Sequence, residues 1–166
     1  MRLARMAAAG DRDALRDLYE EYSDQLFAVA YRLTHSTADA RDVLHDVFAR
    51  LPKALRTFDQ RSSLGTWLRA VTTREALMHL RVRKRRREVP IFGEHMPKRP
   101  PRILDSIALE RALASLPEKL RTVVILKEIE GYSHKEIAEI LKVSYSASAV
   151  RLHRARAALR AALRER

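Results

Sequence analysis

Residues 133–156 have the sequence SHKEIAEILKVSYSASAVRLHRAR, and this stretch decides which fold the chain is expected to adopt. Ser133 and Glu136 have the S-x-x-E spacing of a capping box, in which each side chain satisfies a backbone N–H left free at the start of a helix. Apolar residues follow at helical spacing, stop near Val143 and Ser144, and resume in a basic segment. The stretch therefore predicts two short helices joined by a tight turn, a helix-turn-helix.

The second of these helices is a candidate for DNA binding. A helix-turn-helix places its second helix in the major groove, where side chains near the start of that helix reach the base edges. The arginines in or just after this helix are placed to meet phosphates or bases: Arg151, Arg154, Arg156 and Arg160. The alternative is a helical hairpin in an ordinary bundle whose basic side only faces solvent. The charge of the whole chain favours DNA binding.

The composition favours an all-helical protein with a polyanionic partner. The chain has 166 residues, a net charge of +12 and a sequence pI of about 10.7, which favours nucleic acid first and an anionic membrane surface second. It has only four glycines and is rich in Ala, Leu, Arg and Glu. The lack of cysteine excludes disulfides and thiolate metal sites and is compatible with the cytoplasmic location that we expect. No segment has the apolar length of a secretory signal or of a membrane span, about 18 residues, so no membrane insertion is expected.

Three amphipathic helices are predicted in the first half of the chain. Residues 11–33 carry a long apolar stripe with i, i+3, i+4, i+7 spacing. A turn follows, and Ser36 is the predicted cap of a second helix, which Pro52 should kink or end. Ser62 or Ser63 should cap the third helix.

Charge is divided unevenly within this half. Residues 1–60 contain nine Lys or Arg and ten Asp or Glu, whereas residues 61–87 contain nine and one. The basic third helix carries Trp67 and ends in LRVRKRRRE, residues 80–88. Such a run is often only a solvated helix end, but aromatic rings interleaved with cations suit stacking on unpaired bases.

The second helix has an acidic side. Asp39, Asp42 and Asp46 share one face, because residues three and four apart on a helix are neighbours. This face is either simply solvated or a docking surface for a partner. His45 lies beside two of these carboxylates in the sequence but points another way, and no other residues complete a ligand set, so no metal site is expected.

A Pro-rich segment divides the chain into two predicted all-helical domains. Residues 89–104, VPIFGEHMPKRPPRIL, contain four prolines and a glycine and show no helical period. We therefore expect a first domain at residues 1–88, a linker at 89–104 and a second domain, with the helix-turn-helix, at 105–166.

Two further helices should precede the helix-turn-helix in the second domain. The first is expected at residues 105–116. Pro117 should occupy the first position of the next helix, 118–130, where its missing N–H costs nothing. Gly131 should end that helix as a left-handed cap.

Together these segments resemble the extracytoplasmic-function (ECF) sigma factors, the small members of the sigma-70 family that give bacterial RNA polymerase its promoter specificity. DARDVLHDVFARLPKALRTFD is similar to the polymerase-binding helix of the family's second region, and SSLGTWLRAVTTREALMHLRVRKRRR to the adjoining promoter-melting helix. LERALASLPEKLRTVVILKEIEGYSHKEIAEILKVS, followed by RLHRARAALR, is similar to the fourth region. The motifs L-P-x-x-L-R, G-Y-S-x-x-E-I-A and R-L-H-R-A-R, at their mutual spacing, carry the resemblance.

The resemblance implies three binding surfaces. The acidic side of the second helix would grip the coiled-coil clamp helices of the polymerase's largest subunit, through Asp39, Asp42, Val43, Asp46 and Phe48. The third helix would hold the unpaired non-template strand of the minus-ten element, through Trp67, Arg69, Thr73, Arg74, Arg81, Arg83 and Lys84. The last helix would read the minus-thirty-five element in the major groove, through Ser146, Ala149, Val150, Arg151, His153 and Arg154.

Further partners follow from the same resemblance. The fourth region would also meet the beta flap of the polymerase, and the linker would thread toward the active cleft. A cognate anti-sigma factor, or another recruiting protein, would control the chain. No cofactor and no catalysis are expected.

The chain departs from the family pattern at positions that read DNA. Family members usually carry Asn where this chain has Arg74, and often an acidic or amide residue where it has Met78. After the turn, family members usually have an apolar residue followed by a basic one, whereas this chain has Ser148 and Ala149. Arginine at a guanine edge gains about 1 to 3 kcal/mol of discrimination, which alanine cannot provide. In the turn, this chain has Lys142 where family members usually have glycine. We therefore hypothesise that minus-thirty-five recognition is weak or unusual and that another factor helps.

Other functions remain open at this point. A helix-turn-helix regulator that binds DNA alone would explain residues 133–156 but not the acidic second helix or the basic third helix. A sigma mimic that sequesters an anti-sigma protein would bind that partner without starting transcription. An enzyme is the least favoured class, since no carboxylate cluster, Cys/His metal set or Gly-rich phosphate loop is evident in the sequence.

Overall fold

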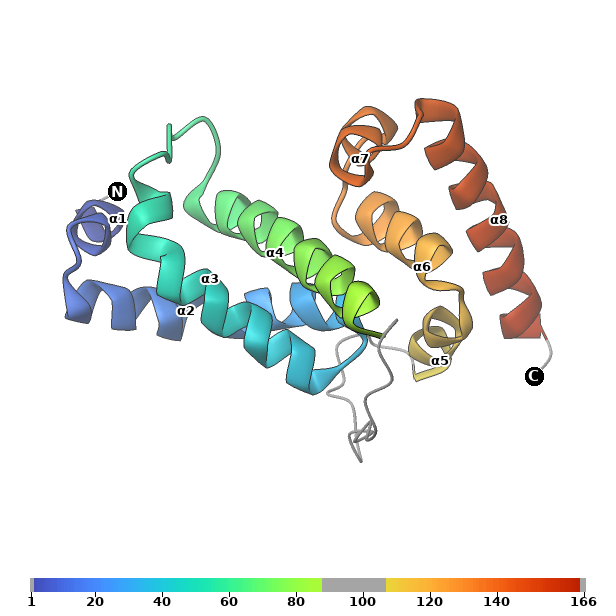
Figure 1. The fold of residues 1–166 in the computed structure, drawn as a ribbon, viewed down its shortest axis with the longest axis horizontal. Coiled ribbons are helices and arrows are strands. Elements are labelled where there is room, and N and C mark those ends of the chain that lie inside the picture. The colour runs from blue at the N-terminus through green and yellow to red at the C-terminus, as the bar shows by residue number, and fades with distance from the viewer. Residues whose placement is uncertain (1, 88–106, 165–166) are drawn as a thin grey trace. The chain divides into compact units, whose positions relative to one another are not determined.

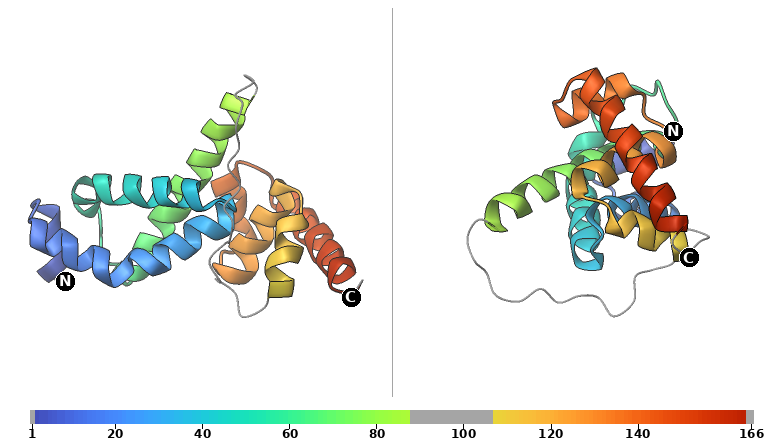
Figure 2. Two further views of the ribbon diagram at one scale, coloured as in Figure 1. Left: turned by 90° about the horizontal axis from the view of Figure 1, so that it is seen from below. Right: turned by 90° about the vertical axis from the view of Figure 1, so that its right-hand side faces the viewer.

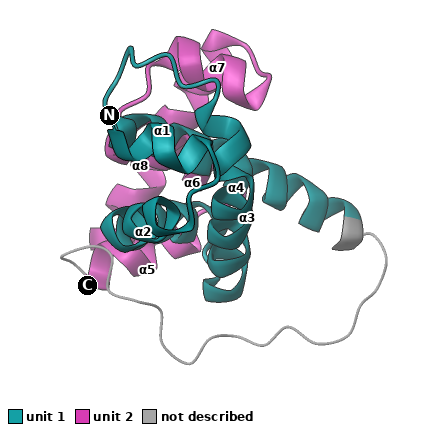
Figure 3. Ribbon diagram, turned by 90° about the vertical axis from the view of Figure 1, so that its left-hand side faces the viewer, with its two compact units in different colours: residues 1–101 teal, residues 102–166 magenta. Residues whose placement is uncertain are grey.

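The chain folds into two compact units, residues 1–101 (unit 1) and residues 102–166 (unit 2), shown in different colours in Figure 3. The computed structural model describes residues 2–87 and 107–164. All regular structure in these ranges is helical, as the sequence predicts (Figure 1). The predicted linker at 89–104 lies outside the described residues, and so does the point where one unit gives way to the other.

Unit 1 is built from four described helices: α1 (Arg2–Ala8), α2 (Arg12–Thr34), α3 (Thr37–Leu55) and α4 (Leu64–Arg87). The three long helices all pack on one another, and α4 crosses the other two in the left view of Figure 2. The largest side chains of their shared core are fully buried leucines: Leu18, Leu26, Leu33, Leu51 and Leu68. Each comes from an apolar stripe with helical spacing.

Local capping sets where these helices begin. Asp11 accepts hydrogen bonds from the backbone N–H of Asp13 and Ala14, both at 3.0 Å, and so starts α2. Ser36 caps α3, as predicted, by accepting from the N–H of Asp39 at 3.2 Å. Of the two candidate serines before α4, it is Ser63 that accepts the N–H of Thr66, also at 3.2 Å.

Helix α1 is not among the helices that the sequence predicts. This helix has only seven residues, and helices shorter than about 12 to 15 residues are marginal unless something packs on them. Ala4 and Ala7, one turn apart, are buried against the unit, and α1 contacts both α2 and α3. The helix therefore depends on tertiary packing, which its own sequence does not reveal.

Of the two outcomes predicted at Pro52, the end of the second helix is wrong, because α3 continues through this residue to Leu55. Proline has no N–H to donate to the carbonyl of Phe48, four residues earlier. Leu51 and Leu55 lie four residues apart on either side of the local defect, and both are buried, at 0% and 6% exposure. Their burial, at about 1.5 to 3 kcal/mol for each side chain, outweighs one lost hydrogen bond.

Unit 2 consists, within residues 107–164, of α5 (Ile107–Ser115), α6 (Glu118–Val124), a π-helical turn η1 (Ile125–Ile129), α7 (His134–Leu141) and α8 (Tyr145–Arg164). The long helix α8 contacts α5, α6 and α7 (Figure 1). Pro117 is the cap before α6 rather than its first residue. The predicted helix 118–130 is continuous but widens at η1, where the N–H of Glu130 bonds the carbonyl of Ile125 at 3.0 Å.

Gly131 ends this helix in the left-handed conformation that the sequence predicts, with φ of 79°. The chain then turns into α7, and the N–H of Tyr132 bonds back to the carbonyl of Leu126 at 2.9 Å. None of the helices in the part of the chain described here is both long and apolar enough to cross a bilayer.

Replacing Pro52 by alanine should stabilise unit 1. The change restores one helical N–H and removes the ring clash, and alanine is favoured over proline in a helix interior by up to about 3 kcal/mol. Urea unfolding followed by the fluorescence of Trp67, the only tryptophan of the chain, measures the gain in the free energy of unfolding. Pro117→Ala is the comparison in unit 2, where unfolding is followed by the loss of helical circular dichroism, and it should give no gain, because Pro117 precedes its helix. Equal stability of Pro52→Ala and the parent would contradict the account of α3.

Candidate functional site

The helix-turn-helix consists of α7, a short turn and the first half of α8. The capping box at its start is present as predicted: the N–H of Ser133 donates to Glu136 Oε2 at 2.7 Å, and the N–H of Glu136 donates to Ser133 Oγ at 3.2 Å. Hydrogen bonds from the Ser133 side chain and backbone lower the pKa of Glu136. The first helix of the motif is therefore fixed by its own sequence.

The turn of the motif is carried by a lysine in a left-handed conformation. Lys142 has φ of 53° and ψ of 50°, and the N–H of the next residue, Val143, bonds the carbonyl of Ala138 at 3.0 Å. Ser144 then caps the second helix by accepting the N–H of Ala147 at 3.0 Å. Lys142 thus takes the conformation for which glycine is the usual choice.

A polar contact ties the two helices of the motif together. Ser148 on α8 is 0% exposed, and its Oγ lies 2.8 Å from Nδ1 of His134 at the start of α7. The ring of His134 also meets the ring of Tyr145 edge-on, with centroids 5.6 Å apart. Ser148 therefore belongs to the internal face of α8, where it takes the place of the expected apolar residue.

The opposite side of α8 is open. Ser148, Leu152 and Ala155 form the buried face at i, i+4, i+7 spacing. Of the residues assigned to minus-thirty-five DNA, some are exposed and others half-buried: Ser146, Val150, His153 and Arg154 are exposed, and Ala149 and Arg151 are half-buried. All six lie on α8, the four exposed ones on the side away from the buried face and the two half-buried ones at its edges. Arg156, farther along, is ion-paired with Glu128.

On unit 1, the acidic end of α3 is joined to the basic end of α4. Nε2 of His79 donates to Asp39 Oδ1 at 3.0 Å, and Nη1 of Arg83 pairs with Asp39 Oδ2. The side chains are largely enclosed, at 18% exposure for Asp39, 25% for His79 and 30% for Arg83. Burial alone would raise the pKa of Asp39, but the two hydrogen bonds and the adjacent positive charges outweigh it, so the pKa lies below its usual value. We call these three residues the Asp39 ion-pair cluster.

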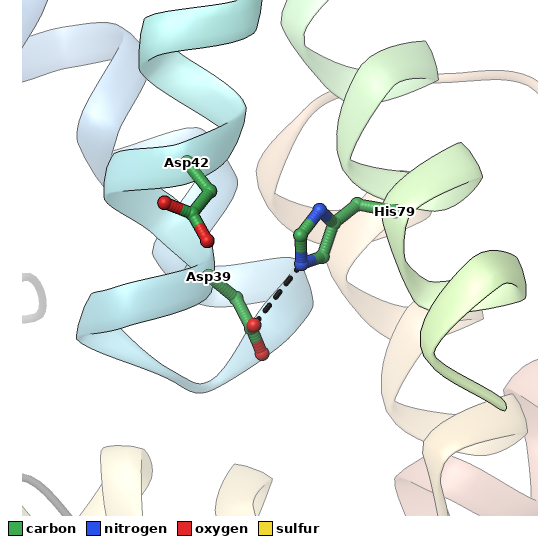
Figure 4. A group of neighbouring side chains, drawn as sticks. All are labelled: Asp39, Asp42 and His79. Atoms are coloured by element: carbon green, nitrogen blue, oxygen red, sulfur yellow. Dashed lines mark hydrogen bonds and ion pairs between the residues drawn. The ribbon is translucent and has the colours of Figure 1, made fainter. Parts of the chain in front are cut away.

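Asp42 lies one turn farther along α3 and faces the same histidine (Figure 4). Asp39, Asp42 and His79 offer ligand atoms that all lie within 4.8 Å of one another, and carboxylate and imidazole groups are common metal ligands. Arg83, however, already supplies the positive charge beside Asp39. A cation would have to displace this guanidinium, so the geometry is better described as an ion-pair cluster. The sequence missed this group because its members come from different helices.

The remaining residues assigned to polymerase binding differ in their exposure. Asp42 is exposed, and Asp46 and Phe48 are half-buried. The ring of Phe48 meets that of Tyr19 on α2 edge-on, with centroids 4.9 Å apart, and Tyr19 itself is 48% exposed. Val43, by contrast, is 0% exposed, so its side chain belongs to the core and is not accessible to a partner.

The residues assigned to minus-ten DNA likewise separate into surface and interior. Thr73 is 0% exposed and cannot touch DNA in this conformation. Trp67 is half-buried, with its ring 5.2 Å from that of Phe58, and Arg69 is half-buried. Arg83 is engaged in the Asp39 ion-pair cluster. The assigned residues that are exposed are Arg74, Arg81 and Lys84.

Two exposed apolar side chains lie among these cations: Met78, which the sequence already marks as a departure from the family pattern at a DNA-reading position, and Val82, which it does not. Met78 is 52% exposed and Val82 is 39% exposed. With Arg74, Arg81 and Arg85 they follow the i, i+4, i+7, i+8, i+11 spacing of one helix side. We call this side of α4 the mixed face. The exposure of Met78 and Val82 could have been inferred from the sequence, because neither fits the helical spacing of the buried residues. The buried residues are Leu68, Ala76, Leu77 and Leu80.

Comparisons with known proteins agree with this arrangement. A family model described as sigma-70 region 2 matches residues 18–86, and one described as sigma-70, region 4 matches residues 106–159. The chain is 30% identical to the ECF RNA polymerase sigma factor SigW of Bacillus subtilis, over 94% of this chain and 92% of that protein.

Two solved structures are similar over most of the chain. The sigma factor RpoE of Bartonella quintana, solved in complex with the anti-sigma factor NepR, has a TM-score of 0.65 at 26% identity and covers 90% of this chain and 98% of its own. CnrH, solved in complex with the cytosolic domain of CnrY, has a TM-score of 0.58 at 28% identity and covers 98% and 96%.

Asp39→Asn should destabilise unit 1 at neutral pH. Hydrogen bonds to charged groups contribute about 1.5 to 3 kcal/mol, and the amide keeps only part of this. Because folding lowers the pKa of Asp39, its contribution is complete above about pH 5 and is lost as the pH falls through about 4 and below. Urea unfolding between pH 3 and pH 7, followed by Trp67 fluorescence, should therefore show a smaller acid loss in the variant.

Asp42→Asn is the matched control, since this exposed carboxylate is one turn away and makes a smaller contribution, about 0 to 1 kcal/mol. If both variants lose the same free energy of unfolding at pH 7, the Asp39 ion-pair cluster is not a source of stability.

Proposed function

The chain belongs to the ECF branch of the sigma-70 family of non-enzymatic transcription initiation factors, and we propose how its two units divide promoter recognition and opening. Sigma factors bind RNA polymerase and promoter DNA. In this proposal, unit 1 binds core polymerase and captures the melted minus-ten strand, and unit 2 docks at the minus-thirty-five region. The mixed face of α4 is the observation that carries it.

The mixed face suits single-stranded DNA. Unpaired bases stack on apolar and aromatic side chains, while cations follow the backbone, and stacking contributes about 1 to 3 kcal/mol per base. Met78 and Val82 offer apolar contacts between Arg74, Arg81 and Arg85. Flipping a base out of a duplex costs a few kcal/mol, which such contacts would offset. Trp67 would add an aromatic ring supported by Phe58.

The acidic side of α3 is the proposed contact with polymerase. Asp42 and Asp46 supply the accessible negative charge, and Phe48 with Tyr19 supplies an apolar patch next to it. Asp39 acts differently, because it is held inside the unit by Arg83 and His79. In the proposed complex, the clamp helices of the polymerase's largest subunit meet this side.

The helix-turn-helix of unit 2 is the proposed minus-thirty-five reader. The contact between His134 and Ser148 fixes α8 relative to α7, which keeps the first turns of α8 in position for the major groove. Arg151 and Arg154 would contact phosphates or bases. The beta flap of the polymerase would also contact unit 2. The linker predicted to run toward the active cleft, residues 89–104, lies outside the described residues.

Regulation by a cognate anti-sigma factor completes the proposal. The solved structure of RpoE is of a complex with the anti-sigma factor NepR, and that of CnrH is of a complex with the cytosolic domain of CnrY. A partner that covered Asp42, Asp46 and Phe48 would exclude polymerase from the same surface.

The test of function is run-off transcription with the full chain and core polymerase on a promoter library. The chain should direct specific initiation, and Arg74→Ala should slow strand opening, measured by permanganate reactivity of unpaired thymines, by about tenfold, as loss of about 1.4 kcal/mol would. Binding of the closed complex should change less. Arg16→Ala, an exposed arginine on α2, is the control. Absence of specific initiation would reject the proposed function. Binding of the chain to DNA but not to polymerase, as expected of a stand-alone repressor, would also reject it.

Arg154→Ala should weaken promoter binding across different sequences and reduce its salt dependence. Each phosphate neutralised contributes about 0.9 to the slope of log K against log salt, so the slope should become shallower by about one. Arg164→Ala, an exposed arginine in the last turn of α8, is the comparison. An unchanged slope with lost preference at one base pair would instead identify Arg154 as a base reader.

A further inference from the structure

An exposed apolar residue occupies the part of α8 that faces away from its packing surface. Val150 is 48% exposed, whereas Leu152, two residues later, is 4% exposed. Ser146 precedes Val150 by four residues and Arg154 follows it by four, and both are exposed. Since residues four apart stack on one side of a helix, the three form one continuous strip.

On the N-terminal side of Val150 two neighbouring residues, Ser146 and Ala149, have short side chains, whereas His153 and Arg154 in the next turn have long ones. Ser146 and Ala149 reach only a short way from the helix axis, and Ser148 is turned inward to His134. Short side chains at Ser146 and Ala149 leave room for this side of the helix to approach the floor of the major groove closely, although Tyr145 in the first turn is large and exposed. The apolar tip of Val150 would then lie at the base edges, where a longer cation would otherwise make contact.

The chemistry of the base edges limits what Val150 can recognise. In the major groove adenine, guanine and cytosine present hydrogen-bonding groups, whereas thymine adds a C5-methyl group that apolar side chains contact. Valine has no donor or acceptor, so only the thymine methyl gains from its contact. A polar edge placed against it would lose hydration without a replacement hydrogen bond.

We propose that Val150 is a specificity-determining residue that reads the methyl group of a thymine in the minus-thirty-five region. The inference rests on the proposed docking of unit 2 at this region and names what the docked helix prefers. It also changes the meaning of Ala149. In this proposal, the absence of a basic side chain at Ala149 lets Val150 contact the base edges, and Arg154, one turn after Val150, supplies the positive charge.

The test compares thymine with uracil, which differs only by lacking the C5-methyl group. Holoenzyme made from the full chain and core polymerase first selects transcribed sequences from a library randomised across the minus-thirty-five region. At the thymine enriched by the parent chain, replacement by deoxyuridine should weaken promoter binding about fourfold, the fold-change that corresponds to about 0.8 kcal/mol for one buried methyl or methylene group.

Val150→Ala should bind the thymine promoter about fourfold less well and should no longer distinguish thymine from uracil. Alanine favours helix more than valine does, so the fold of α8 is retained. Val150→Thr is a second variant of nearly the same shape, which should keep part of the preference. Leu163→Ala, at the exposed far end of the same helix, is the control and should keep all of it.

The outcomes separate this inference from the proposed function. Normal promoter-specific transcription in which no thymine of the region can be distinguished from uracil would overturn the role of Val150 and leave the function standing. An equal preference for thymine over uracil in the parent and in both Val150 variants would do the same. Failure of the chain to direct polymerase to any promoter would overturn both.

Discussion

The Asp39 ion-pair cluster is the polar constraint that links the start of α3 to the basic end of α4. It joins the first turn of α3 to the last described turns of α4, residues 40 or more positions apart in the chain. Without it, a largely enclosed carboxylate would face the loss of hydration with no compensating charge. With it, the basic end of α4 is held in one position relative to α3, and the mixed face continues along the rest of the helix. Arg50 and Glu75 pair at 2.9 Å farther along the same two helices, in a more exposed position.

This cluster also explains how one small unit presents two surfaces of opposite sign. Arg83 and Asp39 pair with each other where α3 and α4 meet, while Asp42 and Asp46 add negative charge to α3 and Arg74 and Lys84 add positive charge to α4. Sigma factors bind both RNA polymerase and promoter DNA, and surfaces of opposite sign suit this pair of partners. In unit 2 the two helices of the motif are joined instead by the hydrogen bond between His134 and Ser148.

The sequence predicts those features that neighbouring residues determine. The caps at Ser36 and Ser133 and the left-handed Gly131 all follow from interactions within four residues, and each is present. The continuation of α3 past Pro52 does not follow from local sequence, because it depends on how deeply Leu51 and Leu55 are buried, which is a tertiary property. In the candidate sites, the residue types and helices could be foreseen. The burial of Thr73 and the engagement of Arg83 could not, because each depends on the rotation of a helix against its neighbours.

The π-helical turn η1 has a consequence for how the length of this chain can vary. A π turn holds one residue more than an α turn, so the helix from α6 to Glu130 accommodates an extra residue without a break in its hydrogen bonding. Ile125 and Leu126 remain buried within it, at 1% and 0% exposure. A relative lacking one residue here could form a regular α-helix and still deliver Gly131 and the helix-turn-helix in the same orientation. This turn is therefore a point where an insertion or deletion is absorbed inside a helix, whereas such changes are ordinarily confined to loops.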